Sequence, residues 1–276
     1  MSIKHIIIVT TDPKSIFLEI LFKYFKSNKK KNKKKITLIG NSTFIINEAK
    51  KNKFRGKFNV VSDISNSKSK LINIINIKID NKSKSNNYSK YISNSFDKCI
   101  SILKKNKKVA LLNGPINKNK FLRKKFLGIT EYLAKKTESK NPVMLIYNKK
   151  FSVSPITTHL PIKYVSKNLN QNKIYKNIKS INNFYRKNLK FKPHIAVLGL
   201  NPHCETFEKF SEEQKIIIPA IKKLKKSRVS VEGPFSADTF FIKKNLEKYN
   251  VVVGMYHDQV LTPLKTLYNF NAINIT

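Results

Sequence analysis

Short runs of β-branched residues alternate with longer amphipathic stretches along the whole chain, and this alternation restricts the possible folds more than any other feature. Strands that lie parallel in one sheet need a long crossover between them, usually a helix. The alternation therefore predicts an α/β fold. The expected strands are residues 6–10, 36–39, 58–61, 71–79, 109–112, 143–147, 194–198 and 251–255, and the expected helices are residues 14–25, 89–105, 171–189, 212–225 and 239–247.

The first expected helix has clear start signals. Asp12 can cap it, and Pro13 suits its first turn. Its apolar positions recur at helical spacing, which predicts one face buried against the sheet. The residues expected on that face are Ile16, Phe17, Ile20, Leu21 and Tyr24.

The chain is strongly basic, since 56 Lys+Arg against 16 Asp+Glu give a formal charge of +40. Such a balance is typical of nucleic-acid-binding proteins. However, only four of these basic residues are Arg, the side chain that binds phosphates and bases through two parallel hydrogen bonds. The excess is Lys, accompanied by abundant Asn and Ile, whose codons are rich in A and T. We interpret the bias as codon drift and expect no specific nucleic-acid partner, although the field would attract anionic substrates.

The sequence contains no run of about 18 apolar residues, the length that spans a bilayer. Its first residues, MSIKHIIIVTTDPK, are typical of a buried strand that enters a turn and not of a signal peptide. We therefore expect a cytoplasmic protein. Cys99 and Cys204 form neither a CxxC motif nor a disulfide framework, so free thiols are expected.

Three of the five histidines each follow a strand-like segment. His159 lies in TTHLP, His203 in GLNPHCE and His257 in MYHDQ. Ligands of open α/β sheets bind beside the carboxyl ends of the strands, so three imidazoles delivered there can converge on one divalent cation. A hydrogen-bonded structural role for each histidine is the alternative, and these residues alone leave both readings open.

Polar residues in neighbouring loops add candidates for the same chemistry. Asp258 and Asp238 can each orient a ligand imidazole, although Asp238 can also act as the cap or first-turn acid of the helix that follows it. Lys118 follows the Gly114-Pro115 turn of NGPINK and is available for an anion. After the first strand the chain reads VTTDPKS, so the GxGxxG turn of a Rossmann site is absent and any dinucleotide must be held in another way.

Taken in order, seven segments resemble the PdxA family of 4-hydroxythreonine-4-phosphate dehydrogenases, and the resemblance covers nearly the whole chain. It is most specific around His203 and His257. The segments are NGPINK, GITEYL, TTHLP, GLNPHCE, EEQKIIIPAI, GPFSADTFF and MYHDQVLTPLK. The resemblance implies an isocitrate-dehydrogenase-like α/β/α fold with two domains flanking a cleft. The first domain is expected over residues 1–122 and the second over residues 123–276, which includes the metal-site loops and the dimer interface.

The resemblance also implies a reaction and its cofactors. The expected reaction is the NAD-dependent oxidation and decarboxylation of 4-phosphooxy-L-threonine to 3-amino-2-oxopropyl phosphate, in pyridoxal 5'-phosphate biosynthesis. A divalent metal cation (Zn, Mg, Mn or Co) is expected on His159, His203 and His257, the last of which reaches the site of the partner subunit in a homodimer. The positions that correspond to substrate contacts are Thr130, Lys265 and Asn274.

Three departures from the family pattern leave alternatives open. Ile129 stands where the family usually has a histidine that donates to the substrate phosphate, and the glycine-rich first loop reads TTDPKSI. The sequence stops at Thr276, before the return to the first domain and the substrate-contacting arginine of typical members. We therefore expect a shortened member that binds NAD poorly and turns over little substrate. The alternatives are a dehydrogenase of a related phosphorylated hydroxy acid and an inactive basic protein that binds polyanions.

Overall fold

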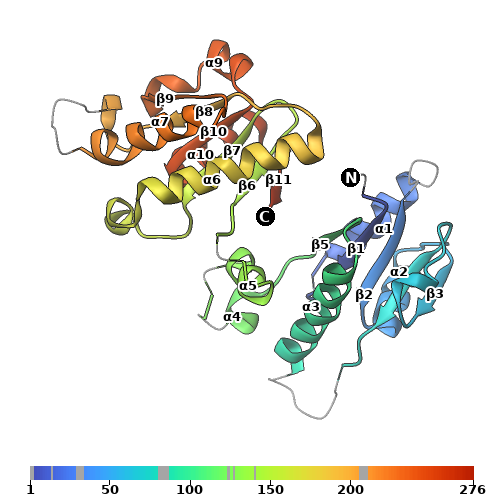
Figure 1. The fold of residues 1–276 in the computed structure, drawn as a ribbon. Helices are drawn as coiled ribbons and strands as arrows, with labels where there is room; N and C mark the ends of the chain where they lie inside the picture. Colours follow the sequence, from blue (N-terminus) through green and yellow to red (C-terminus); the bar gives the residue numbers. More distant parts are fainter. Residues whose placement is uncertain are drawn as a thin grey trace. The chain divides into compact units, whose positions relative to one another are not determined.

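The computed structural model describes residues 3–13, 15–28, 34–79, 87–122, 125–126, 128–139, 141–204 and 211–276. The chain divides into two compact units, Met1–Thr137 and Glu138–Thr276, and each is built on its own sheet (Figure 1). The expected α/β class is confirmed by both sheets and the helices between their strands. The predicted domain boundary after residue 122 concerns the architecture of the family and stays a prediction.

The first unit contains a five-stranded parallel sheet with the strand order β3-β4-β2-β1-β5. The strands are β1 (His5–Val9), β2 (Lys35–Gly40), β3 (Phe58–Val61), β4 (Ile72–Asn76) and β5 (Val109–Asn113). The helices are α1 (Phe17–Ser27), α2 (Ser42–Lys51), α3 (Asn87–Lys105), α4 (Lys118–Phe121) and α5 (Ile129–Lys136), with a 3₁₀ turn η1 (Ile64–Asn66).

Both faces of this first sheet are apolar, as a buried parallel sheet requires. Successive residues of a strand point to opposite faces, so Ile7 and Ile8 of β1 belong to different apolar clusters. Ile8 packs with Phe22 of α1, whereas Ile7 packs with Ile92 of α3. Helices α1 and α2 accordingly cover one face, and α3 covers the other (Figure 1).

The second unit contains a six-stranded sheet with the order β11-β6-β7-β10-β8-β9, in which β6 runs antiparallel to the other five strands. The strands are β6 (Leu145–Tyr147), β7 (Ser152–Thr157), β8 (Ile195–Leu198), β9 (Val231–Phe235), β10 (Val251–Tyr256) and β11 (Ile273–Ile275). Helices α6 and α7 pack on one face of the sheet, and α8 and α10 pack on the other.

The helical segments of the second unit include several short and irregular turns. The α-helices are α6 (Gln171–Phe184), α7 (Ile218–Lys226), α8 (Ala237–Phe240), α9 (Lys243–Lys248) and α10 (His257–Tyr268). The 3₁₀ turns are η2 (Ile162–Tyr164), η3 (Ser166–Asn168) and η5 (Pro202–Cys204), and the π-helical turns are η4 (Tyr185–Leu189) and η6 (Glu213–Ile217).

Each strand expected from the sequence is present, with small shifts at the ends. Strands β7 and β9 were not among the expected ones, because each contains a proline, Pro155 or Pro234, which weakens a strand signal. Helices α2, α4, α5 and α10 were also missed. The helix expected over residues 239–247 forms two short helices, α8 and α9.

The expected start of the first helix is wrong, and its expected apolar face is right only at Phe17 and Leu21, which pack on the core. Ser15 donates its backbone N–H and its hydroxyl to the carbonyl of Asp12, which closes a separate turn before the helix begins at Phe17. Asp12 is therefore not the cap. The other three residues expected on that face, Ile16, Ile20 and Tyr24, are exposed. The buried residues are Leu18, Leu21, Phe22 and Phe25.

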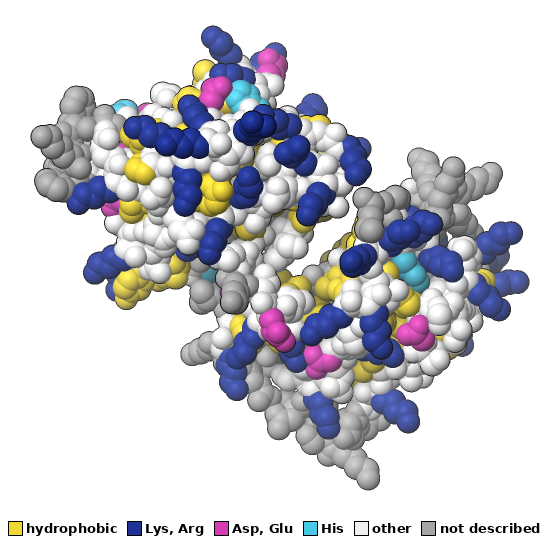
Figure 2. Space-filling view, in the orientation of Figure 1, with side chains coloured by type: hydrophobic (Ala, Val, Ile, Leu, Met, Phe, Trp, Pro, Cys, Tyr) yellow, Lys and Arg dark blue, Asp and Glu magenta, His cyan; other side chains and the backbone are white. Residues whose placement is uncertain are grey.

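The surface charge and the state of the two cysteines agree with the sequence analysis. Figure 2 shows Lys and Arg over the visible surface of both units, with far fewer Asp and Glu. Cys99 and Cys204 are buried free thiols, as expected, and burial raises the pKa of Cys99 to about 12. Among the described residues, no helix combines the length and the apolar character needed to cross a membrane.

Truncating Phe22 tests the corrected face of α1. Its ring is fully buried and stacks on Phe54 at a centroid distance of 5.1 Å. We expect Phe22→Ala to lower the free energy of unfolding by about 3–5 kcal/mol, measured by urea denaturation. The control is Tyr24→Ala on the exposed side, expected to change it by about 0.5 kcal/mol or less. Equal losses from the two variants would contradict this orientation of the helix.

Candidate active site

Three adjacent parallel strands of the second unit end at the same edge of the sheet. In the order β7-β10-β8, Val252 pairs with Val153 on one side and with Ala196 on the other. Parallel strands in this register send the chain out at one edge, where α/β sheets bind ligands. His159, His257 and His203 lie in the three segments that follow these strands.

The structure brings two of these imidazoles together. The ring centroids of His159 and His257 lie 5.7 Å apart, whereas His203 Nδ1 lies 3.8 Å from Asp238 Oδ2. Over the described part of the chain, no three His, Cys, Asp or Glu side chains are grouped closely enough to hold a metal ion. The three-histidine site therefore stays a prediction.

The backbone turns sharply at two of the histidines. His159 and His203 have φ values of 48° and 56°, in the left-handed region that few residues other than glycine enter. His257 instead begins α10, directly after β10. Local backbone geometry thus differs among the three histidine loops, although their place relative to the sheet is shared.

Carboxylates lie beside two of the histidines. Asp258 Oδ1 lies 2.6 Å from His257 Nδ1, an arrangement that leaves His257 Nε2 for a ligand. Asp238 lies in the first turn of α8, where Oδ1 accepts hydrogen bonds from the Ser236 hydroxyl and the Thr239 backbone N–H. These bonds, with the Ser236 contribution largest, lower the pKa of Asp238 from its usual value. Asp238 thus serves as a first-turn acid and also faces His203.

A buried carboxylate binds backbone N–H groups of the loop that contains His203. Glu213 is fully buried, and its Oε1 accepts the backbone N–H groups of Leu200 and Asn201 at 2.7 and 2.9 Å. Its Oε2 accepts the side-chain amide of Asn201 at 2.8 Å. A Cβ on Gly199 would lie 2.8 Å from Cys204 Sγ and 3.0 Å from Glu213 Oε1, so glycine is required there. The turn after β8 is therefore packed tightly onto this carboxylate.

A buried amide joins the loops after β10 and β8. Gln259 Oε1 accepts the Met255 backbone N–H at 2.6 Å, and its Nε2 donates to the Gly199 carbonyl at 2.7 Å. A Cβ on Gly254 would lie 2.8 Å from Gln259 Oε1. Sequence reasoning gave no role to Gln259 or Glu213, although both lie in the family-like segments MYHDQ and EEQK.

The expected substrate positions lie on both units. Lys265 is exposed in the last turn of α10, eight residues after His257 and so about 12 Å farther along the helix axis. Asn274 is exposed on β11, opposite Ile146 of β6. In the first unit, Thr130 is buried in the first turn of α5, and Lys118 is exposed at the start of α4. The substrate roles of these residues stay predictions.

The carboxyl edge of the first sheet is also held by specific contacts. The Thr11 hydroxyl donates to the Pro115 carbonyl at 2.6 Å, and the Gly114 backbone N–H donates to the Val9 carbonyl at 2.9 Å. A Cβ on Gly114 would lie 2.7 Å from the Phe17 ring. These contacts join the loop after β1 to NGPINK, the segment that leads to Lys118.

Replacing Glu213 tests the buried support of the His203 loop. Glu213→Ala leaves the partly buried N–H groups of Leu200 and Asn201 without their acceptor, at about 1–3 kcal/mol each. We therefore expect a loss of about 2–6 kcal/mol in the free energy of unfolding, by urea denaturation. Glu213→Gln keeps one acceptor oxygen and should lose less. The control is Glu247→Ala at an exposed position, which should change the free energy of unfolding by about 0.5 kcal/mol or less. A change as small as this for Glu213→Ala would contradict the proposed support of the loop.

The fold and this edge of the second sheet match known proteins. A model of the family described as pyridoxal phosphate biosynthetic protein PdxA matches residues 31–276. The 4-hydroxythreonine-4-phosphate dehydrogenase of Klebsiella pneumoniae has a solved structure that matches with a TM-score of 0.83 and 26% identity. That match covers 98% of this chain and 87% of the other.

Curated relatives agree with the family match. The 4-hydroxythreonine-4-phosphate dehydrogenase of Sulfurihydrogenibium sp. (strain YO3AOP1) is 34% identical over 220 residues, which are 78% of this chain and 68% of the relative. That of Aquifex aeolicus is 40% identical over 60% of this chain and 52% of the relative. The D-threonate 4-phosphate dehydrogenase of Pectobacterium atrosepticum is 34% identical over the same shares, 60% and 52%. The matches thus span from about half to two thirds of the relatives' lengths, and the chain belongs to the PdxA family.

Proposed function

We propose that the chain catalyses the NAD-dependent oxidation and decarboxylation of 4-phosphooxy-L-threonine to 3-amino-2-oxopropyl phosphate, a step of pyridoxal 5'-phosphate biosynthesis. The observation that carries this proposal is the exit of three histidine loops at one sheet edge in a member of the PdxA family. The proposal includes a cytoplasmic homodimer with shared active sites, in which His257 acts in the partner subunit's site.

The donor set fits a divalent cation. Imidazole nitrogens and carboxylate oxygens are ligands for Zn, Mn, Co and Mg, and the pairing of His257 with Asp258 is typical of a metal-binding histidine. His159, His203 and His257 are the proposed ligands. When bound, the cation would supply positive charge to the substrate hydroxyl, and NAD+ would serve as the acceptor of the hydride from the same carbon.

The chain's own residues bind the substrate and move its proton. Lys265 attracts the anionic substrate, and Thr130 and Asn274 donate or accept hydrogen bonds to it. Asp258, exposed beside His257, relays the hydroxyl proton to water. The oxidised product is a β-keto acid, which loses CO2 readily. As the C–C bond to the carboxylate breaks, its electron pair moves onto the ketone, and negative charge that is absent from the ground state develops on the ketone oxygen. Positive groups held beside this oxygen therefore stabilise the transition state more than the ground state and accelerate the reaction.

A second candidate is a dehydrogenase of a related phosphorylated hydroxy acid. Ile129 is partly buried against the apolar cluster of α3, α4 and α5. Its aliphatic side chain has no hydrogen-bond donor for a phosphate. In addition, one relative of the chain is named a D-threonate 4-phosphate dehydrogenase. Ile129 changes the expected contact to the phosphate, and the relative's name gives a phosphorylated hydroxy acid as its substrate. Together they support a related phosphorylated hydroxy acid as the alternative substrate.

Removing a proposed ligand tests the metal site. We expect His203→Ala to lower both bound metal, measured by elemental analysis, and NADH formation from 4-phosphooxy-L-threonine. The control is His194→Gln, because His194 contacts Glu232 at the opposite end of β8. Unchanged metal content in His159→Ala, His203→Ala and His257→Ala would overturn the ligand assignment.

The same assays distinguish the candidate functions. NADH formation from D-threonate 4-phosphate alone would favour the second candidate. Undetectable metal with salt-sensitive polyanion binding would favour an inactive basic protein.

Replacing Lys265 tests the substrate contact. Loss of a hydrogen bond to a charged group costs about 1.5–3 kcal/mol, so Lys265→Ala should raise KM by about tenfold or more. Lys222→Ala removes the same charge from an exposed site on α7 and should leave KM nearly unchanged. Equal increases in steady-state assays of the two variants would mean that only the general field attracts the substrate.

A further inference from the structure

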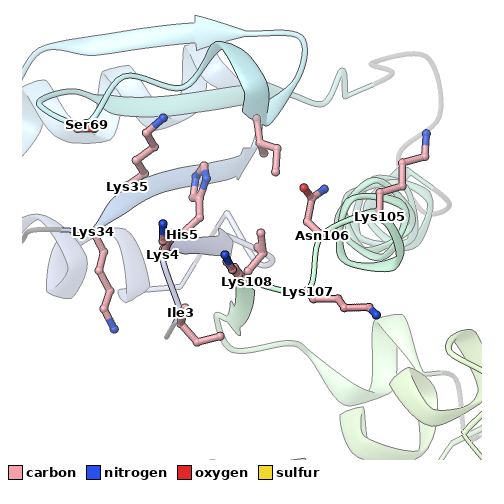
Figure 3. Close-up of a pocket in the computed structure, with 12 residues that line it drawn as sticks. Ile3, Lys4, His5, Lys34, Lys35, Ser69, Lys105, Asn106, Lys107 and Lys108 are labelled. Atoms are coloured by element: carbon pink, nitrogen blue, oxygen red, sulfur yellow. The ribbon is translucent and has the colours of Figure 1, made fainter. Parts of the chain in front are cut away.

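A lysine-rich pocket lies at the amino ends of three adjacent strands of the first sheet, β2, β1 and β5 (Figure 3). Its volume is about 780 Å³. Of its 12 lining residues six are lysines, whereas Lys and Arg together make up only 56 of the 276 residues in the chain. The local density of positive charge therefore exceeds that of the chain as a whole. The lysines are Lys4, Lys34, Lys35, Lys105, Lys107 and Lys108.

The backbone holds three of these lysines in fixed positions. Lys4 donates its backbone N–H to the Lys108 carbonyl at 2.9 Å, and Lys35 donates to the Lys4 carbonyl at 3.3 Å. The parallel register places His5 opposite Lys35 on one side and Val109 on the other. Since each strand begins just after or at a lysine, the sheet places the backbones of Lys4, Lys35 and Lys108 side by side. Their side chains and those of the other three lysines extend from this edge in several directions (Figure 3).

The six lysines lack a local counter-charge. None of them forms a salt bridge within the described part of the chain, and no Asp or Glu lines the pocket. Asp63, which precedes the lining residue Ile64, accepts the Ser65 backbone N–H as the cap of η1, and this bond, ahead of the charges of Lys98 and Lys105, lowers its pKa. Burial and then the charge of Lys35 lower the pKa of His5 at the pocket floor. Like charges held close together repel, and a bound polyanion would relieve that repulsion.

We propose that this pocket binds a linear polyphosphate group, carried either by a nucleoside triphosphate or by inorganic polyphosphate. Ammonium groups bind phosphate oxygens as point charges and do not need the planar geometry of Arg. The volume lies in the range of small-molecule pockets, and Ile3, Ile64 and Val109 add apolar surface that a nucleoside can contact. A nucleic-acid duplex spreads its phosphates along a rod and matches a concave pocket poorly.

This pocket is separate from the proposed reaction. Within the first unit, Lys118 follows the carboxyl end of β5, whereas the pocket lies at the amino ends of the strands. The three histidines proposed to bind metal lie in the second unit. Polyphosphate binding there does not depend on metal or on turnover. The proposal can therefore fail while the proposed dehydrogenase activity stands, and the reverse also holds.

The test compares two triple variants of equal charge change by isothermal titration calorimetry. Lys4→Gln/Lys35→Gln/Lys108→Gln removes pocket cations, and Lys222→Gln/Lys225→Gln/Lys226→Gln removes exposed cations of α7. The probes are tripolyphosphate, ATP and a short DNA duplex. An ionic strength of about 0.15 M limits the reach of distant charges to about 8 Å. Circular dichroism checks that both variants are folded.

We expect the pocket variant to bind tripolyphosphate and ATP at least about tenfold more weakly than the parent chain, and the α7 variant to bind them within about twofold. Tighter binding of ATP would identify a nucleotide as the source, and tighter binding of tripolyphosphate would identify inorganic polyphosphate. Equal weakening in both variants, no binding by the parent chain, or duplex DNA that displaces both probes at equal phosphate concentration would each overturn the proposal.

Discussion

The parallel pairing of β7, β10 and β8 is the constraint on which the candidate site depends. All the residues of β7 and β8 are buried, as are those of β10 up to Met255, so a shift of register would move polar groups into the core. This pairing determines that the three following segments leave at one edge. The positions of His159, His203 and His257 are consequences of strand order, since they are separated by more than 40 residues in the sequence.

Buried polar side chains then determine how those segments are arranged. The buried side chains of Glu213 and Gln259 satisfy backbone groups of the turn after β8 and of the end of β10. Buried donors and acceptors are costly to leave unpaired, so these contacts specify one loop conformation. The exposed lysines act in a different way. Because solvent and salt screen their charges, they create a general positive field but do not hold a loop in one conformation. The pocket at the amino ends of β1, β2 and β5 differs from that field because the sheet places the backbones of three of its lysines side by side.

Prediction from sequence succeeded where a short segment consists almost entirely of apolar, β-branched residues. The β-branched runs of β1, β2 and β10 are long and apolar, so each predicted strand agrees with the structure to within a residue or two. It failed where apolar residues occur on both sides of a helix. In α1 the exposed Ile20 and the buried Phe22 are equally apolar, and only packing against the sheet distinguishes them. Helix α10 was missed because it contains Pro263, which normally interrupts a helix.

The sequence by itself determined the α/β class, the basic surface, the free thiols and the family-like histidine segments, because these depend on composition, periodicity and short motifs. Only the tertiary structure decided which elements are neighbours. It placed His159 beside His257 and His203 beside Asp238, and it showed Glu213 and Gln259 beneath their loops. Strand order and side-chain packing are set by long-range burial, and no local pattern records which distant segments share one sheet edge.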